Sequence, residues 1–210
     1  MRELILKMSM SLDGFVSDLE GRNGWMFGDD PAAKAWLVET TWNSSLHIMG
    51  SRSFRDMAAW WPTSTDTFAP PMNQIPKAVF SRQGAALLHD PPATAALDAA
   101  RSHAAHTQGK ALQPGGESWS DPHVASGDLA TEIARLKAAD GKPILAHGGV
   151  RFARSLVAAG LVDEFILAVH PVALGRGLPL FADRPAPLPL RLVCSTPFPG
   201  GAQAQIYRPA

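Results

Sequence analysis

The sequence has a single cysteine, Cys194, so no disulfide can form within the chain, and we expect a reducing, cytoplasmic compartment. No apolar run approaches the roughly 18 residues of a membrane span, and Lys7 interrupts the short apolar start, which argues against a signal peptide. Only 18% of the residues are charged, the formal net charge is +0, and the basic residues are not clustered. These features exclude a nucleic-acid or membrane partner held by charge, and near-neutrality permits self-association into a homodimer.

Several nucleotide- and metal-binding signatures are also missing. The sequence has no GxGxxG fingerprint, no P-loop and no HExxH motif. His103 and His106 stand three positions apart, with His89 and His123 on either side of them, but no cysteine ligand set accompanies these histidines. We therefore expect no metal, and a metal-dependent hydrolase built on the histidines remains only a distant alternative.

Hydrophobic residues make up 46% of the 210 residues, which suits one globular domain with a full core. Strand-like apolar runs alternate with helical patterns. We expect strands at 3–10, 45–49, 76–81, 143–146 and 165–169, helices at 31–42, 54–59, 128–139 and 150–159, loops at 15–28 and 63–73, and a terminal hairpin of 188–195 and 203–208. This order predicts an α/β fold with a mostly parallel mixed sheet flanked by helices.

Residues 85–126 have a different composition, rich in Ala, His, Pro and Gly. We interpret them as a flexible insertion in which 93–106 is helical, 107–121 is irregular and Trp119 is anchored. The chain 1–210 is then a single domain carrying this insertion.

Polar and glycine residues follow the predicted strands where each strand ends. Because the carboxyl ends of parallel strands lie along one edge of a sheet, we expect residues 11–14, 50–53, 81–82 and 147–149 to converge. Gly148 and Gly149 precede a predicted helix, whose first N–H groups have no internal partner and attract an anion such as a pyrophosphate. A tight turn that needs positive φ is the alternative interpretation of the two glycines.

Two basic segments repeat this chemistry at neighbouring strand ends. Arg52 lies within Gly50-Ser51-Arg52-Ser53, and Arg82 follows Ser81. Hydroxyl groups beside a guanidinium suit a phosphate monoester, so a nucleotide with an extra phosphate is favoured. A serine N-cap beside a solvated arginine is the alternative for the first segment.

Longer stretches of the chain resemble the bacterial RibD C-terminal-domain family, whose members have the dihydrofolate reductase fold. The stretches are 8–16 (MSMSLDGFV), 48–54 (IMGSRSF), 61–62 (WP), 77–81 (KAVFS), 127–129 (GDL) and 144–181. The most specific part runs from GLVDE at 160–164 through PVALGRGLPLF at 171–181. The resemblance covers most of the chain except about 85–119.

The resemblance implies an NADPH-dependent reductase of a small planar heterocycle, pterin- or pyrimidine-like. It places the 2′-phosphate end of the cofactor on Gly50, Ser51, Arg52, Ser53, Ser81 and Arg82, and the pyrophosphate on Gly148, Gly149, Val150, Arg151 and Phe152. It places Asp13 near the nicotinamide as the candidate catalytic residue, and we assign Ser11, Trp60, Trp61 and His147 to the substrate. From the residues alone, Asp13 before Gly14 is equally a turn, and the two tryptophans are equally core residues.

His147 stands where the riboflavin-pathway reductases of this family carry a glutamate. The chain also lacks the zinc motif of the deaminase domain found with those reductases. We therefore expect a stand-alone member with a different substrate. A non-catalytic nucleotide-binding or sensing module is the alternative.

Overall fold

A computed structural model describes residues 1–210 except 27, 29, 90–110, 183 and 185. Its main sheet has eight strands in the order β5-β4-β3-β6-β1-β7-β10-β9. The strands are β1 (Leu4–Ser11), β3 (Leu46–Gly50), β4 (Lys77–Phe80), β5 (His123–Ala125), β6 (Ile144–His147), β7 (Glu164–His170), β9 (Leu190–Pro197) and β10 (Gln203–Pro209). The six strands from β5 to β7 are parallel, and β10 and β9 add an antiparallel hairpin. The predicted fold class is confirmed.

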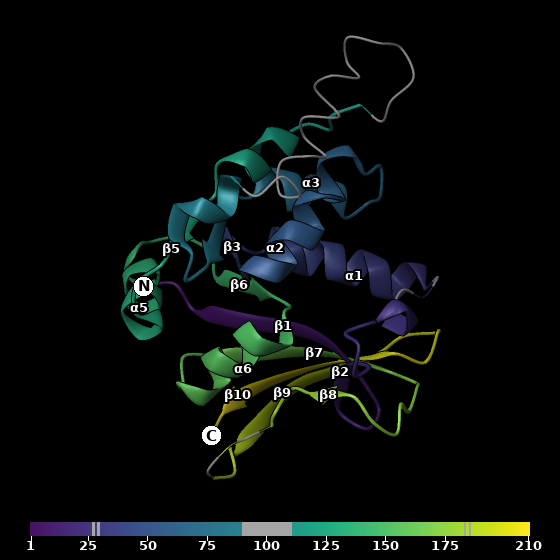
Figure 1. Ribbon diagram of the computed structural model, residues 1–210. Coiled ribbons are helices and arrows are strands. Elements are labelled where there is room, and N and C mark those ends of the chain that lie inside the picture. The colour runs from purple at the N-terminus through teal and green to yellow at the C-terminus, as the bar shows by residue number, and fades with distance from the viewer. Residues whose placement is uncertain (27, 29, 90–110, 183, 185) are drawn as a thin grey trace.

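The helices are α1 (Pro31–Trp42), α2 (Ser51–Ala58), α3 (Ala69–Gln74), α5 (Leu129–Ala138) and α6 (Val150–Ala158). Short 3-10 turns occur at η1 (Gly24–Met26), η2 (Trp61–Thr63), η3 (Gly84–His89) and η4 (Gly116–Ser120). In the view of Figure 1, α1, α2 and α3 lie above β1, and β9 and β10 lie below it.

The alternation of residues in β1 explains its central place. Leu4, Leu6, Met8 and Met10 are buried on one face, in a cluster that includes residues of α5 and α6. Lys7, Ser9 and Ser11 point to the other face, since side chains alternate along a strand. On that second face, the register places Met49 and Val79, which pack in a cluster with Phe54, Met72 and Trp119. The sheet is therefore covered on both faces, and only the second face carries a row of polar residues beside its core.

Several predicted loops contain regular structure. Within 15–28, β2 (Phe15–Ser17) pairs antiparallel with β8 (Leu178–Pro179) in a separate two-stranded sheet. Within 63–73, α3 forms because Pro70 and Pro71 occupy its first turn, where proline is tolerated. The second helix begins at Ser51 rather than at residue 54, so its hydroxyl and guanidinium groups lie in the first helical turn.

The described ends of the 85–126 segment belong to the packed structure. The indole of Trp119 is 1% exposed and donates from Nε1 to Asn73 Oδ1 at 2.8 Å, which confirms its anchoring. Lys77 Nζ donates to Ser118 Oγ at 2.7 Å and to the Ile75 carbonyl at 2.8 Å. β5 adds an edge strand to the sheet. The predicted insertion is therefore too wide at both ends, and the helix expected at 93–106 lies outside the described residues.

Candidate functional site

The carboxyl ends of β3, β4 and β6 converge as predicted. A Cβ placed on Gly50 would lie 3.1 Å from Phe152 Cβ, so the start of α2 touches the start of α6. A Cβ on Gly149 would lie 2.7 Å from Ser53 Oγ, which is a second close approach between the same two helices. Gly149 also has a φ of +78°, which only glycine adopts readily. Both glycines are thus required for two helix starts to lie side by side.

The two helix starts at this edge have no side-chain cap. α2 begins after Gly50 and α6 after Gly149, and no side chain among the described residues caps either helix start. In contrast, Asp30 accepts from two first-turn N–H groups of α1 at 3.0 and 3.1 Å, and Asp128 accepts from one of α5 at 3.0 Å. The positive ends of two helix dipoles therefore meet at one place, and this arrangement favours a bound anion.

An aromatic contact joins α6 to the end of β4, and a polar contact joins α2 to the segment after β4. The ring of Phe152 packs against the ring of Phe80, the last residue of β4, with centroids 4.9 Å apart. Arg55 of α2 donates to Gln83 Oε1 at 3.2 Å, so the segment after Ser81 adjoins α2. All the residues predicted to contact the cofactor therefore come from three adjoining segments, namely 50–53, 81–82 and 148–152.

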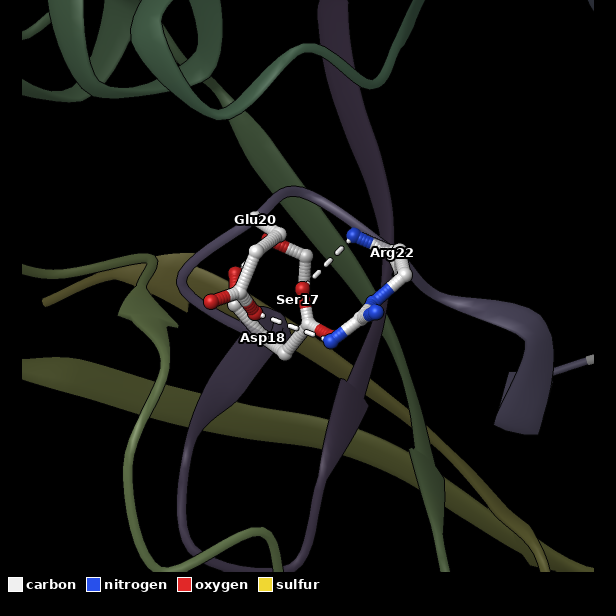
Figure 2. Close-up of polar contacts among 4 residues, drawn as sticks. All are labelled: Ser17, Asp18, Glu20 and Arg22. Carbon is white, nitrogen blue, oxygen red and sulfur yellow. Dashed lines mark hydrogen bonds and ion pairs between the residues drawn. The ribbon is translucent and has the colours of Figure 1, made fainter.

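Arg52 lies beside the loop that follows β2. The guanidinium Nη2 of Arg52 is 3.6 Å from the position of a Cβ on Gly21. Figure 2 shows that this loop is held by its own charges: Asp18 accepts from the backbone N–H of Arg22 at 2.8 Å and from Arg22 Nε at 2.6 Å. Arg22 Nη2 also lies 3.0 Å from Glu20. Arg22 is thus occupied, whereas the exposed Arg52 has no ion pair within the part of the chain that the structure describes.

Asp13 is part of a hydrogen-bonded turn. Its carboxylate accepts from Ser11 Oγ at 2.6 Å, from Gly175 N at 2.7 Å and from Leu174 N at 3.1 Å. The Ser11 hydroxyl, together with these two N–H groups, lowers the pKa of Asp13 below its usual value, so the group is a carboxylate near neutral pH. These contacts show that Asp13 joins the end of β1 to the 174–175 loop. They do not test its predicted catalytic role.

The residues predicted to contact substrate lie in different environments. Trp60 is 54% exposed, after the end of α2. Trp61 packs against Phe68, with ring centroids 6.3 Å apart, and its carbonyl accepts from Asn73 Nδ2 at 3.0 Å. His147 is 4% exposed at the end of β6. Trp61 therefore has the core-packing contacts that were the alternative to a substrate wall.

Sequence reasoning missed Lys7 as a site residue. Lys7 pairs in parallel register with His147, and its Nζ lies 5.4 Å from the centre of the Phe68 ring. Burial lowers the pKa of Lys7 from 10.5 to about 8. The available signal was the lysine itself, since a charged residue in the middle of an interior strand is unusual.

Two buried histidines lie next to Lys7. The rings of His147 and His47 are 4.5 Å apart, and His47 Nε2 is 3.1 Å from Ser44 Oγ. His147 Nε2 is buried without a hydrogen-bond partner in the structure. Burial lowers the pKa of His47 to about 3 and the pKa of His147 well below its usual value, so both rings are neutral at physiological pH.

Two more buried nitrogen atoms without a hydrogen-bond partner lie at the far end of β1. The ring of Trp25 packs edge-on against His170, with centroids 5.5 Å apart, and Trp25 Nε1 and His170 Nε2 are buried without a partner. His170 pairs in register with Ser11. Orphaned buried polar atoms are rare in folded proteins, so this end of the second face is also a candidate ligand-contact region.

The described residues contain neither a metal cluster nor a membrane-spanning helix. No group of three His, Cys, Asp or Glu side chains within them is arranged to hold a metal ion, and His103 and His106 lie outside them. Within the same residues, no helix is both long and apolar enough to cross a membrane.

The fold and this edge define an α/β domain of the kind that binds ligands at the carboxyl ends of parallel strands. The chain belongs to the RibD C-terminal domain family, whose model matches residues 2–204. Among curated proteins, the uncharacterized protein YyaP of Bacillus subtilis is 38% identical over 80 residues, 38% of this chain and 43% of that protein. The uncharacterized protein YwjB of the same organism is 33% identical over 94 residues, 44% of this chain and 54% of that protein. The match therefore spans about half the length of these relatives.

Solved structures share the fold at low sequence identity. A pyrimidine reductase-like protein from Corynebacterium diphtheriae has a TM-score of 0.67 at 17% identity, over 100% of this chain and 92% of that chain. A putative riboflavin biosynthesis protein from Shewanella has a TM-score of 0.64 at 20% identity, over 99% of both chains. A diaminohydroxyphosphoribosylaminopyrimidine deaminase/5-amino-6-(5-phosphoribosylamino)uracil reductase from Thermotoga maritima has a TM-score of 0.64 at 15% identity, and this chain matches 57% of it.

Proposed function

We propose that the protein is an NADPH-dependent reductase that transfers hydride to a small planar heterocycle, pterin- or pyrimidine-like. The observation that carries the proposal is the meeting of two uncapped helix starts, those of α2 and α6, at the carboxyl edge of the sheet. Membership of the RibD C-terminal domain family supports an oxidoreductase.

The residues at this edge fit an extended, multiply phosphorylated cofactor. The N–H groups at the start of α6 would hold the pyrophosphate, because a Cβ on Gly148 would meet nothing within 4 Å and leaves the approach open. Arg52 and Arg82 are exposed on the two adjoining segments and would hold the 2′-phosphate. When bound, NADPH supplies a hydride to an electron-poor ring atom of the substrate.

The protein's own contribution is then positioning and exclusion of water. The helix starts fix the anionic part of the cofactor, and the Phe80–Phe152 pair gives an apolar contact beside them. The Asp18–Arg22 pair holds the loop next to Arg52 in a defined conformation. Substrate would bind on the second face of the sheet, where Lys7 and His147 lie.

Cofactor titration tests this proposal. Tryptophan fluorescence should show saturable binding of NADPH at micromolar concentration, and Arg52→Ala should weaken NADPH by 10-fold or more while leaving NADH within 2-fold. The control is Arg191→Ala, because Arg191 is an exposed arginine on β9 at the other end of the sheet. Absence of saturable NADPH binding would count against the proposal, and equal losses for NADPH and NADH would remove Arg52 from the 2′-phosphate.

A non-catalytic NADP-binding or sensing module is the second candidate. The observation that favours it is the state of the acids and histidines: Asp13 is a carboxylate held by three donors, and the buried His147 is neutral. Substrate-dependent oxidation of NADPH in a panel of heterocycles would exclude this candidate.

We further expect a homodimer, which sedimentation analysis would test.

A further inference from the structure

Lys7 is a charged group in the middle of the sheet for which the protein supplies no counter-charge. Within the described residues, its Nζ makes no hydrogen bond or ion pair, and its polar contact is the face of the Phe68 ring at 5.4 Å. Lys7 is partly exposed, so water reaches part of its side chain, but drawing a lysine out of bulk water is costly unless an anion or several acceptors compensate it. We therefore looked for a group that could balance the charge of Lys7.

Two acids near Lys7 are already paired with other basic residues. Glu164 at the start of β7 faces the same side of the sheet but lies 2.9 Å from Arg208 Nε. Asp66, two residues before Phe68, lies 2.7 Å from Lys34 Nζ. Glu39 of α1 and Asp56 of α2 are exposed, and no described acid forms an ion pair with Lys7.

The other polar groups near Lys7 do not supply a negative charge either. His147, its neighbour on β6, is 4% exposed and has an unpartnered Nε2. The ring of His47 on β3 lies 4.5 Å from the ring of His147, and Lys77 on β4 pairs in register with His47. This row of one lysine, two imidazoles and a second lysine contains no acid, and the charge of Lys7 within it favours an anion that comes from outside the protein.

We infer that the substrate is an anionic planar ring, carrying a carboxylate or an acidic enolate oxygen, which the unpaired Lys7 ammonium neutralises. This inference rests on the proposed function. A neutral oxo-ring would accept a hydrogen bond from Lys7 but would leave the positive charge uncompensated, so the protein discriminates by charge rather than by ring shape.

Two ligands with the same ring size but different charge can show whether the protein recognises charge or shape. Barbiturate is ionised at neutral pH, whereas uracil is a neutral oxo-pyrimidine of the same size. Calorimetric titration of the NADPH-loaded protein should show barbiturate binding at least 10-fold more tightly than uracil. Lys7→Met, which keeps an unbranched side chain and removes the ammonium, should weaken barbiturate by at least 10-fold and change uracil by less than 2-fold. Lys142→Met is the control, because Lys142 is an exposed lysine whose Nζ donates to the Trp42 carbonyl.

A second variant tests the same idea without removing Lys7. His147→Glu places a carboxylate beside Lys7, supplies the missing counter-charge, and should reduce barbiturate binding by at least 10-fold with no loss of uracil. Saturable NADPH binding with equal affinity for the two rings, or barbiturate affinity unchanged in both variants, would overturn the inference and leave the proposed function standing. Absence of NADPH binding to the unmodified protein would overturn the proposed function and the inference together.

Discussion

The contact between the starts of α2 and α6 makes a quantitative prediction about two adjacent glycines. Gly148 and Gly149 both have positive φ, +30° and +78°, so an alanine at either position is strained by about 1–3 kcal/mol. Only Gly149 adds a clash, because its Cβ would lie 2.7 Å from Ser53 Oγ, while a Cβ on Gly148 would meet nothing within 4 Å. Overpacking of this kind costs about 1–3 kcal/mol. Gly149→Ala should therefore destabilise the protein by about 1–3 kcal/mol more than Gly148→Ala.

Ser53→Ala should remove this additional cost. The Cβ of Ser53 would lie 3.8 Å from a Cβ on Gly149, which is an ordinary contact, so only the hydroxyl is in the way. Urea denaturation of the four proteins of the Gly149→Ala and Ser53→Ala cycle gives the coupling free energy. We expect the double variant to be about 1–3 kcal/mol more stable than additivity requires, against an additivity error of about 0.5 kcal/mol. A coupling energy within that error would refute the predicted clash, because it would show that the Ser53 hydroxyl turns away from an alanine at position 149 at little cost.

Two further predictions concern ionisable groups. Asp13→Asn should lower the urea midpoint at pH 7, because a carboxylate held by Ser11 and two loop N–H groups is lost. Since the pKa of Asp13 is lowered by folding, this stabilisation should fade as the pH falls below about 4, and equal midpoints at pH 7 would contradict the structural role. Lys77 is 3% exposed, and burial lowers its pKa from 10.5 to about 7, so the unfolded chain binds one more proton between these values. The free energy of unfolding of wild type relative to Lys77→Met should therefore rise with pH by about 1.4 kcal/mol per unit between pH 7.5 and 9, and a flat difference would show that Lys77 stays charged.

The regular strands and helices could be predicted because their patterns are local. The alternation of Leu4, Leu6 and Met8 and the capping residues Asp30 and Asp128 each fix an element within one or two turns of chain. β5 and β8 are too short to show a period, and they exist only because a neighbouring strand is available to pair with them. The proline-rich start of α3 was mistaken for a loop, since proline is compatible with both.

The anion-binding part of the site could also be predicted from the sequence. Glycines and arginines at strand ends converge once the sheet is known to be parallel, and the structure brings 50–53, 81–82 and 148–152 together. Lys7 could not be predicted as a site residue, because that role depends on the absence of an acid that pairs with it. The pairing of Glu164 with Arg208 and of Asp66 with Lys34 is a long-range fact that no local pattern contains.

The position of β1 at the middle of the sheet has a consequence for biosynthesis. Leu4 pairs with Ile144 and Ile5 with Glu164, so the strand that is made early has partners made roughly 140 and 160 positions later. At about 5–20 residues per second, these partners follow roughly 10–30 s after β1. During that interval the Leu- and Met-rich face of β1 has no native strand on either side, and the central part of the sheet cannot close until β7 has been made. The nascent chain is thus exposed to premature association for most of its synthesis, because the same arrangement places β1 at the centre of the folded sheet.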